Sequence, residues 1–315
     1  MSREAEILLA GELHRPSLAK ALARGEIERL RRGAYRAVPD GTTVPQEDAR
    51  GRARARAAAV HRQLRATHTF SHETAALLWG CALWRLPGRT HVTQSYRASG
   101  QAAADLARHA GDPARLDRTV RDGLPVTSMG RTIVDCALTM HPLEALVIAD
   151  SARRLGLDLV RAREQLAARP TRNGRSRAGW VLDHADGGAD SPWETWLRYV
   201  CLRAGLPRPV TQAPVHTPRG LYHCDLGWPE HEVFAEFDGR VKYRDDGVRP
   251  GHDGSRELLR EKARYEAVRE AGVDPVRVLA TGPGGVAAVV ARIASRFPPE
   301  IRGGFRVDPL LPPPP

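Results

Sequence analysis

The sequence has few cysteines, few lysines and no long apolar run. Its 315 residues include 4 cysteines, none of them in a C-x-x-C pair. Disulfide frameworks and cysteine-based zinc sites need closely paired cysteines, so these four are expected to be buried thiols in a reducing compartment. No apolar run reaches the roughly 18 residues of a membrane span. The first ten residues, with Arg3, Glu4 and Glu6, do not resemble a signal peptide. The sequence therefore predicts a cytoplasmic protein without a membrane partner.

The charge is strongly of one sign, although lysine is nearly missing. Lys+Arg total 48 against 37 Asp+Glu, a net charge of +11, and the lysines are Lys20, Lys242 and Lys262 alone. A basic chain favours anionic partners, nucleic acid first. The arginine bias also suits a GC-rich genome, so part of the excess can be coding bias. The excess is densest in residues 46–65, where 6 arginines and 2 acids give 6 − 2 = +4. Charge suggests DNA as a partner without showing it.

The composition permits a sizeable core, since 42% of residues are hydrophobic and 27% are charged. Glycines and prolines divide the chain into four parts. Residues 1–45 are expected to form a winged-helix-like head, with short helices at Ser2–Ala10 and Pro16–Arg24 followed by a hairpin. Residues 46–188 are expected to be mainly helical, residues 189–296 to form an α/β domain, and residues 297–315 to be a disordered proline-rich tail.

Two arginine-rich segments have two possible roles each. In the helix expected over residues 46–65, alanines recur at helical spacing while Arg50, Arg52, Arg54 and Arg56 occupy the rest of the surface. Residues 169–177 hold four arginines and no acids, and are expected to form an exposed loop. Both segments can be ordinary solvated surface, or they can bind phosphates of DNA.

The C-terminal part gives the clearest pattern of elements. Ser191, Pro192 and Glu194 combine an N-cap, a first-turn proline and a capping glutamate, which predicts a helix ending at Gly205. Strands are then expected at 210–216, 221–228, 232–237 and 276–280, with a helix at 256–271 before the last strand and another after it. The predicted order is α-β-β-β-α-β-α.

Carboxylates gather on two neighbouring strands of this order. Alternation leaves Asp225 on the face opposite its apolar neighbours, and it does the same for Glu236, with Asp238 on the side of Glu236. Clustered carboxylates repel each other unless a cation neutralises them, and oxygen ligands without His or Cys select Mg²⁺ or Mn²⁺. The sequence therefore predicts a metal held by Asp225, Glu236 and Asp238, an arrangement suited to phosphodiester hydrolysis.

These residues lie in a segment that resembles the PD-(D/E)XK nuclease superfamily, in particular the very-short-patch-repair endonucleases. The resemblance covers about residues 189–282 and is carried by short strings, namely Ser191–Glu194, Gly205–Pro207, Cys224–Pro229, Ala235–Gly239, Lys242–Tyr243, Glu261–Lys262 and Gly272…Arg277. It implies a restriction-endonuclease-like α-β-β-β-α-β core with Glu194, Asp225 and Glu236 in the acidic roles.

One position departs from the superfamily pattern. Asp238 stands where that pattern has a lysine. The cation would have to come from Lys242, or from Lys262 on the next helix, which is expected to face inward and to lie nearer Glu236. Each site residue also has an ordinary explanation. Glu194 can serve only the cap, Asp238-Gly239 can be a turn, and both lysines can be surface residues, while His72, His223 and His231 are expected to be structural.

The N-terminal part resembles a second family, the abortive-infection type IV antitoxins. The strings that carry this resemblance are Arg29–Tyr35, Ser71–Ala76 and Gly123–Ser128 with Arg131-Thr132. It implies a winged helix whose recognition helix would be Pro16–Arg24, and a protein that represses its own promoter.

The sequence thus favours a Mg²⁺-dependent (or Mn²⁺-dependent) DNA endonuclease in defence or repair, with a cognate toxin or defence-operon protein as a further possible partner. The alternative is a non-catalytic DNA-binding regulator of antitoxin type that keeps a degenerate nuclease fold. A third class is a protein–protein adaptor whose charge reflects arginine bias. Metal dependence separates the first class from the second, and salt-sensitive DNA binding separates both from the third.

Overall fold

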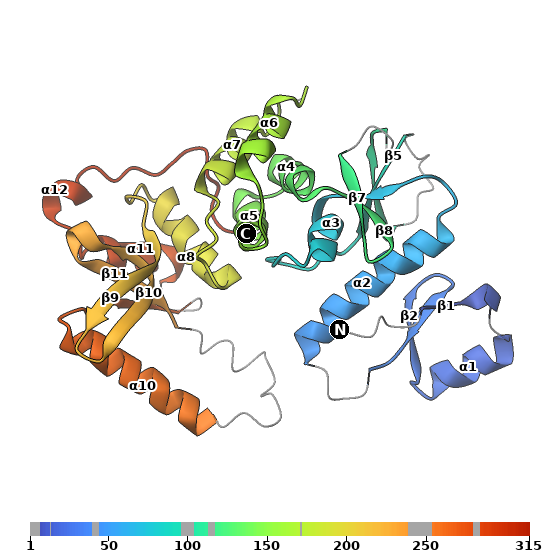
Figure 1. The fold of residues 1–315 in the computed structure, drawn as a ribbon, viewed down its shortest axis with the longest axis horizontal. Coiled ribbons are helices and arrows are strands. Elements are labelled where there is room, and N and C mark those ends of the chain that lie inside the picture. The colour runs from blue at the N-terminus through green and yellow to red at the C-terminus, as the bar shows by residue number, and fades with distance from the viewer. Residues whose placement is uncertain are drawn as a thin grey trace. The chain divides into compact units, whose positions relative to one another are not determined.

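The computed structural model describes residues 7–12, 14–39, 44–95, 104–112, 117–170, 172–238, 254–279 and 284–315. The chain forms two compact units (Figure 1). Unit 1 comprises residues 1–136 and 157–170, and unit 2 comprises residues 137–156 and 171–315. The expected middle domain at 46–188 is therefore divided between the units.

The head of unit 1 is a small three-stranded sheet. Its elements are β1 (Ile7–Leu9), a 3₁₀ turn (Ala10–Glu12), α1 (Arg15–Ala23), β2 (Ile27–Arg31) and β3 (Ala34–Ala37), with strand order β1-β3-β2. The predicted α1 and hairpin are confirmed, and Gly33 turns between β2 and β3 with a φ of +74°. The predicted helix over Ser2–Ala10 is wrong for its second half. Ile7–Leu9 has no helical period to decide its conformation, and it is extended because it pairs with β3.

Helix α2 (Pro45–Gln63) confirms the helix predicted for residues 46–65. It is buried along two strips rather than one. Ala55 and Ala59 pack against Leu30 and Ala34 of the head. A second strip, which includes Ala57 and Val60, packs into the core of the next sheet. Small side chains allow the two sheets to approach the same helix.

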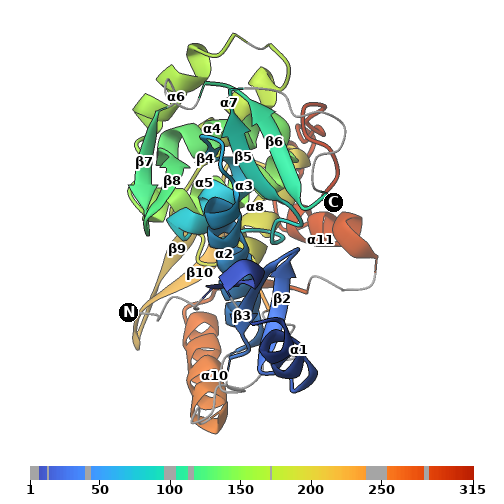
Figure 2. The ribbon, with the colours of Figure 1, turned by 90° about the vertical axis from the view of Figure 1, so that its right-hand side faces the viewer.

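The remainder of unit 1 is built on a five-stranded mixed sheet that the sequence did not predict. Residues 46–188 nevertheless contain more helix than strand, as expected. The strands are β4 (Thr69–Phe70), β5 (Thr90–Gln94), β6 (Leu106–Ala110), β7 (Arg118–Arg121) and β8 (Leu124–Thr127), in the order β6-β5-β4-β8-β7 (Figure 2). Helix α3 (His72–Trp79) begins after Ser71, and helices α4 (Met129–Thr139) and α6 (Leu159–Ala167) follow the sheet in the chain. These strands have 2 to 5 residues, too few for alternation to be visible in the sequence.

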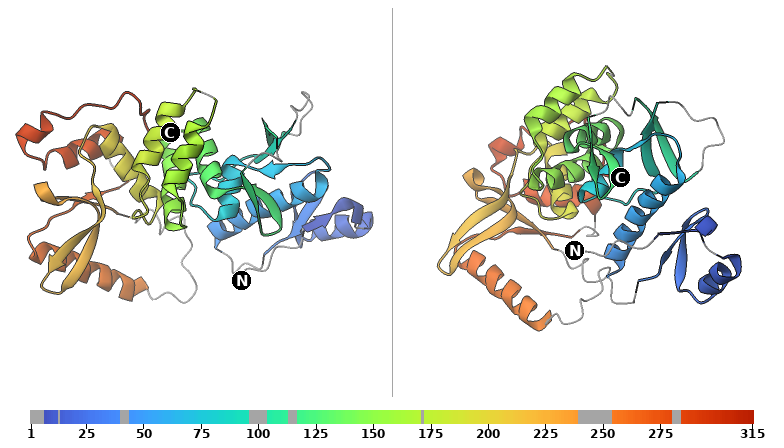
Figure 3. Two further views of the ribbon diagram at one scale, coloured as in Figure 1. Left: turned by 45° about the horizontal axis from the view of Figure 1, so that its top comes forward. Right: turned by 45° about the vertical axis from the view of Figure 1, so that its right-hand side comes forward.

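Unit 2 contains the predicted α-β-β-β-α-β-α order. Its elements are α8 (Pro192–Arg203), β9 (Val210–Thr217), β10 (Gly220–Trp228), β11 (Val233–Phe237), α10 (Gly254–Glu270), β12 (Val276–Val278) and α11 (Gly285–Ala294). The sheet order is β12-β11-β10-β9, antiparallel except for β11 and β12. Helices α8 and α11 pack on one face of this sheet and α10 packs on the other (Figure 3).

A buried ion pair explains why α5 (Pro142–Arg154) belongs to unit 2. Arg198 of α8 is fully buried and its Nη2 lies 2.5 Å from Oδ2 of Asp150 in α5. Arg198 also donates to the carbonyl of His184, the last residue of α7 (Arg175–His184), at 2.6 Å. Removing one partner would leave a buried charge uncompensated, so the pair fixes α5 and α7 onto α8.

The last residues differ from the disordered tail expected at 297–315. After α12 (Pro299–Arg302), Asp308 N donates to the carbonyl of Arg203 at 2.8 Å. Tyr199 Oη donates to the carbonyl of Pro312 at 2.8 Å, and Leu311 is 2% exposed. Prolines have no backbone N–H to satisfy, so this segment can pack on α8 as an irregular strap. Among the described residues, no helix is both long enough and apolar enough to cross a bilayer.

Candidate active site

Glu194 is held at the start of α8 by a capping box. Ser191 Oγ accepts from Glu194 N at 3.3 Å and donates to Glu194 Oε1 at 2.7 Å, and Asp190 N donates to Oε2 at 2.7 Å. Gln212 Nε2 adds a further contact to Oε2 at 3.3 Å. The side chain is 7% exposed. Glu194 therefore performs the capping role foreseen from sequence while its charge stays inside the unit.

Asp225 and Glu236 come from neighbouring antiparallel strands. β10 pairs with β11 from Trp228 opposite Val233 to Leu226 opposite Ala235, and Asp225 and Glu236 each lie one residue beyond the end of this paired stretch. The N–H of Phe237 donates to Asp225 Oδ2 at 2.7 Å, and Glu236 is 5% exposed. The two carboxylates predicted to converge are thus brought together.

The environment of Asp225 disfavours its charge. Burial is the largest cause, followed by the nearby charge of Glu194 and then that of Glu236, while the Phe237 N–H and Arg264 act in the opposite direction. Together they raise the pKa of Asp225 from 3.8 to about 7. A carboxyl of this kind is stabilised by a bound cation, because the cation offsets both the repulsion and the lost hydration.

Arg264 supplies the positive charge that sequence reasoning sought in a lysine. Its Nη1 lies 2.9 Å from Glu236 Oε1 and donates to the carbonyl of His223 at 3.0 Å. The helical spacing contains a signal for this position. Arg264 precedes the buried Ala267 and Val268 by three and four residues, so it shares their side of α10.

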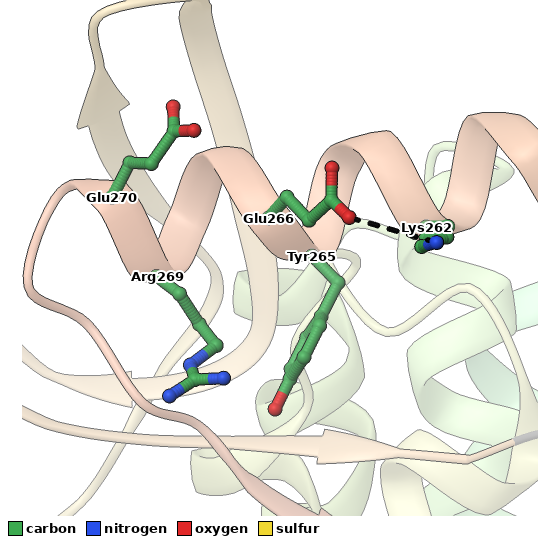
Figure 4. Close-up of a pocket in the computed structure, with 5 residues that line it drawn as sticks. All are labelled: Lys262, Tyr265, Glu266, Arg269 and Glu270. Atoms are coloured by element: carbon green, nitrogen blue, oxygen red, sulfur yellow. Dashed lines mark ion pairs between the residues drawn. The ribbon is translucent and has the colours of Figure 1, made fainter.

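Lys262 does not face the carboxylates, so that prediction is wrong. Its side chain is 71% exposed, and its Nζ lies 3.9 Å from Glu266 Oε1 (Figure 4). The surface pocket there is also lined by Tyr265, Arg269 and Glu270. Two residues along a helix amount to a rotation of about 200°, which separates Lys262 from the side occupied by Arg264.

The other predicted site residues are placed as follows. Lys242 lies outside the described residues, so the expectation that Lys262 lies nearer Glu236 than Lys242 does stays a prediction. Asp238 follows β11, where its N–H donates to the carbonyl of Val278 at 2.8 Å. The ring of His231 packs against Phe297 with centroids 5.3 Å apart, as a structural residue does.

The arginines considered for phosphate binding have partners within unit 1. Arg50, Arg54 and Arg56 donate to the backbone carbonyls of Cys81, Leu77 and Gly88 respectively. Arg52 lies 2.8 Å from Glu28. In the segment expected to be an exposed loop, Arg169 lies 2.6 Å from Asp135, and residues from Arg175 onward belong to α7. These contacts favour a structural role for the arginines of α2 and for Arg169.

A group of three histidines in unit 1 was missed by sequence reasoning. His72, His91 and His109 each offer a ring nitrogen, and these nitrogens lie within 4.8 Å of one another. The three come from α3, β5 and β6, and only the pairing of short strands brings them together. The three positions are far apart in the sequence and do not show the spacing of a metal-binding motif.

Comparison with known proteins finds relatives of this chain but no family to which it belongs. No family model matches the chain. Two proteins of Mycobacterium tuberculosis, the uncharacterized protein MT2308 of strain CDC 1551 / Oshkosh and the uncharacterized protein Rv2248 of strain ATCC 25618 / H37Rv, are each 31% identical over 192 residues. The match covers 58% of this chain and 66% of each relative, so the chain spans just under two thirds of their length.

One solved structure is similar at a lower level. The crystal structure of the RV2827C protein from Mycobacterium tuberculosis covers 66% of this chain and 78% of its own, with 17% sequence identity and a TM-score of 0.36. A likeness of this size supports no argument about the fold or the function of this chain.

Proposed function

We propose that the protein acts on DNA as a Mg²⁺-dependent or Mn²⁺-dependent endonuclease in defence or repair, with its active site in unit 2. The observation that carries the proposal is the proximity of Asp225 to Glu194 and Glu236, whose charges raise its pKa, beside the ion pair of Glu236 with Arg264. The α-β-β-β-α-β order around this site agrees with the resemblance to PD-(D/E)XK nucleases.

Asp225 and Glu236 offer the carboxylate oxygens that a hard divalent cation prefers. The Cys224 thiol also contacts Glu236. Among the described residues, Asp225, Glu236 and Asp238 do not form a group whose ligand atoms all lie within 4.8 Å of one another. The raised pKa of Asp225 indicates negative charge that the surrounding groups compensate only in part. Asp225 and Glu236 would hold the ion, with Asp238 as the third candidate. When bound, the ion would polarise the phosphate and favour ionisation of a water molecule.

The other side chains would position the substrate. The Arg264 side chain is 34% exposed, so its guanidinium can contact a phosphate oxygen while keeping its bond to Glu236. Glu194 is fixed by its capping bonds and adds negative charge beside Asp225. Lys242 stays a candidate for the cation that the superfamily pattern supplies with a lysine, whereas the outward position of Lys262 removes it from that role.

The second candidate is a non-catalytic DNA-binding regulator of antitoxin type, possessing a cognate toxin as partner. Specific observations favour it. Glu236 is already paired with Arg264, and the oxygens of Glu194 are engaged in the cap. Asp238 also stands where the superfamily pattern has its lysine. A site of this kind can keep its shape without turning over a substrate.

Plasmid cleavage separates the two candidates. The full-length protein is incubated with supercoiled plasmid and Mg²⁺ or Mn²⁺, beside Asp225→Asn, Glu236→Gln and the control Lys262→Met. Loss of metal-assisted charge stabilisation worth several kcal/mol predicts cleavage slower by about 10³-fold in the first two variants. Lys262→Met should cleave at the wild-type rate, because that side chain lies outside the site.

The outcomes are distinct. A wild type that binds DNA without cutting it under either metal supports the regulator. A cleavage rate that survives Asp225→Asn shows that a contaminant or another site is responsible, and the assignment of the site then fails. A protein that does not bind DNA at low salt contradicts both candidates and supports the adaptor.

A further inference from the structure

We propose that unit 1 holds a transition-metal ion, Zn²⁺ by preference, between His72, His91 and His109. This site is separate from the carboxylates of unit 2 and does not depend on the proposed nuclease activity. Its ligands are imidazoles, which suit zinc and its neighbours and bind Mg²⁺ poorly. The ion would tie the start of α3 to strands β5 and β6.

The distances match what a zinc ion requires. His91 Nδ1 and His109 Nε2 lie 3.1 Å apart, and the ring nitrogens that the three histidines offer lie within 4.8 Å of one another. Tetrahedral zinc with Zn–N bonds of about 2.0–2.1 Å places its nitrogen ligands about 3.3–3.4 Å apart. The spacing of the nitrogens is close to this value, and binding an ion would also require the stacked rings of His72 and His109 to turn so that their nitrogens face it.

His72 is held in place by its backbone and by its neighbours. It has a φ of +52°, a left-handed conformation that costs energy for a residue with a Cβ. Its Nδ1 lies 3.0 Å from Ser71 Oγ, which accepts from Thr93 Oγ1 at 2.9 Å. The contact of Nδ1 with Ser71 Oγ thus orients the ring and leaves Nε2 as the ligand atom, as in known zinc sites.

A carboxylate stands beside the three rings. Glu73 Oε2 lies 3.2 Å from His91 Nδ1, and it can either complete a fourth position or hold the ligand ring. Arg131 and Arg169, which act on His72, both bind the buried Asp135 at 2.9 and 2.6 Å, whereas Arg89 lies near His91 and His109. Burial also lowers the pKa of His72 to about 2 and those of His91 and His109 to about 4, so the rings are neutral near pH 7.

The alternative is that no metal binds and that the three rings stack as a polar part of the core. His72 and His109 do stack, with centroids 3.6 Å apart and planes 15° apart. A second histidine pair in unit 1 serves as a control for metal binding. His61 Nδ1 and His68 Nε2 lie 3.0 Å apart, and among the described residues this pair is not part of the three-histidine group.

Metal binding by the full-length, untagged protein tests the proposal. The protein is stripped with EDTA, dialysed and titrated with ZnCl₂ against a chromogenic chelator, with MgCl₂ as the comparison. We expect one Zn²⁺ per chain and no competition from Mg²⁺. His91→Gln and His109→Gln should each weaken Zn²⁺ binding by at least about 10-fold. His61→Gln should bind as the wild type does.

A second measurement does not depend on variants that may fold poorly. X-ray absorption at the zinc edge of the loaded wild type should show nitrogen ligands with the outer-shell scattering of two or three imidazoles. Wild-type protein that binds no Zn²⁺ overturns the proposal. So does a zinc spectrum without imidazole scattering, or Zn²⁺ binding that is equal in the wild type, His91→Gln and His109→Gln.

Discussion

The two units each bury a cluster of like groups beside a mixed sheet, and the clusters respond to burial in opposite ways. In unit 2 the pKa of Asp225 is raised to about 7, because its charged form is the disfavoured one. In unit 1 the pKa values of His91 and His109 are lowered to about 4 for the same reason. A carboxylate is charged when deprotonated and an imidazole when protonated, so desolvation shifts them in opposite directions.

This difference bears on what each cluster can bind. The carboxylates repel each other and recruit Arg264, which leaves a site that would be completed by a hard cation. The imidazoles are neutral and share hydrogen bonds, so a metal would replace those bonds rather than relieve repulsion. The following experiments test whether the two clusters differ in this way.

The largest expected effect is an opposite pH dependence of the two units in metal-free protein. Asp225 binds its proton more tightly when folded, so its stabilising contribution is present below about pH 4 and is lost as the pH rises through 7. A shift from 3.8 to about 7 corresponds to at most about 4 kcal/mol. His91 and His109 act in reverse, because their contribution is full above about pH 6.5 and is lost as the pH falls towards 4.

Hydrogen exchange between pH 5 and 8, corrected for the intrinsic rates, measures this prediction strand by strand. Protection of β10 and β11 should fall as the pH rises, and protection of β5 and β6 should increase. Asp225→Asn should flatten the first trend, and His109→Gln the second. Trends of the same sign in both units would contradict this account of the clusters.

The next effect is that each metal should stabilise only one of the two units. Binding to the folded state stabilises it by about 2.7 kcal/mol when the ligand is at 100 times its Kd. Mg²⁺ or Mn²⁺ should raise the melting temperature of unit 2, and Zn²⁺ that of unit 1. Asp225→Asn combined with Glu236→Gln should abolish only the first shift, and His91→Gln only the second. Calorimetry in which one variant removes both shifts would show that the metals share a site.

A smaller effect is expected from Arg264. Arg264→Met removes the partner of Glu236 and leaves a buried carboxylate unpaired. Because the arginine is 34% exposed, solvent screens part of the pair, and a loss of about 1–2 kcal/mol in the free energy of unfolding is expected. Urea titration of the two single variants, Arg264→Met and Glu236→Gln, and their double variant gives the coupling energy. A coupling near zero would mean that the pair does not organise the site.

The smallest effect concerns the arginines of α2. Arg50→Gln with Arg54→Gln removes bonds to the carbonyls of Cys81 and Leu77, which predicts a loss of about 1 kcal/mol each in stability. A phosphate contact would instead contribute about 0.9 to the slope of log K against log salt for duplex DNA. We expect that slope to be unchanged. A slope that becomes clearly shallower would restore α2 as a DNA-binding element.

The sequence by itself determined most of unit 2. The cap at Ser191, the turns between strands and the alternation in β11 are local patterns, and they predicted the order of elements and the convergence of Asp225 with Glu236. These carboxylates lie on strands joined by a short connection, so their proximity follows from a hairpin that the sequence displays. The cation was missed because a known pattern directed attention to lysines, although the spacing to Ala267 and Val268 pointed to Arg264.

Only the tertiary structure decided the rest. The five-stranded sheet of unit 1 joins strands of 2 to 5 residues, whose pairing depends on neighbours that are remote in the chain. The same pairing assembles His72, His91 and His109, and packing on α8 orders the segment expected to be a disordered tail. Local propensity acts over a few residues and is readable from the sequence. Contacts between remote segments depend on how the whole unit buries its apolar surface, so they cannot be predicted from the sequence of any one segment.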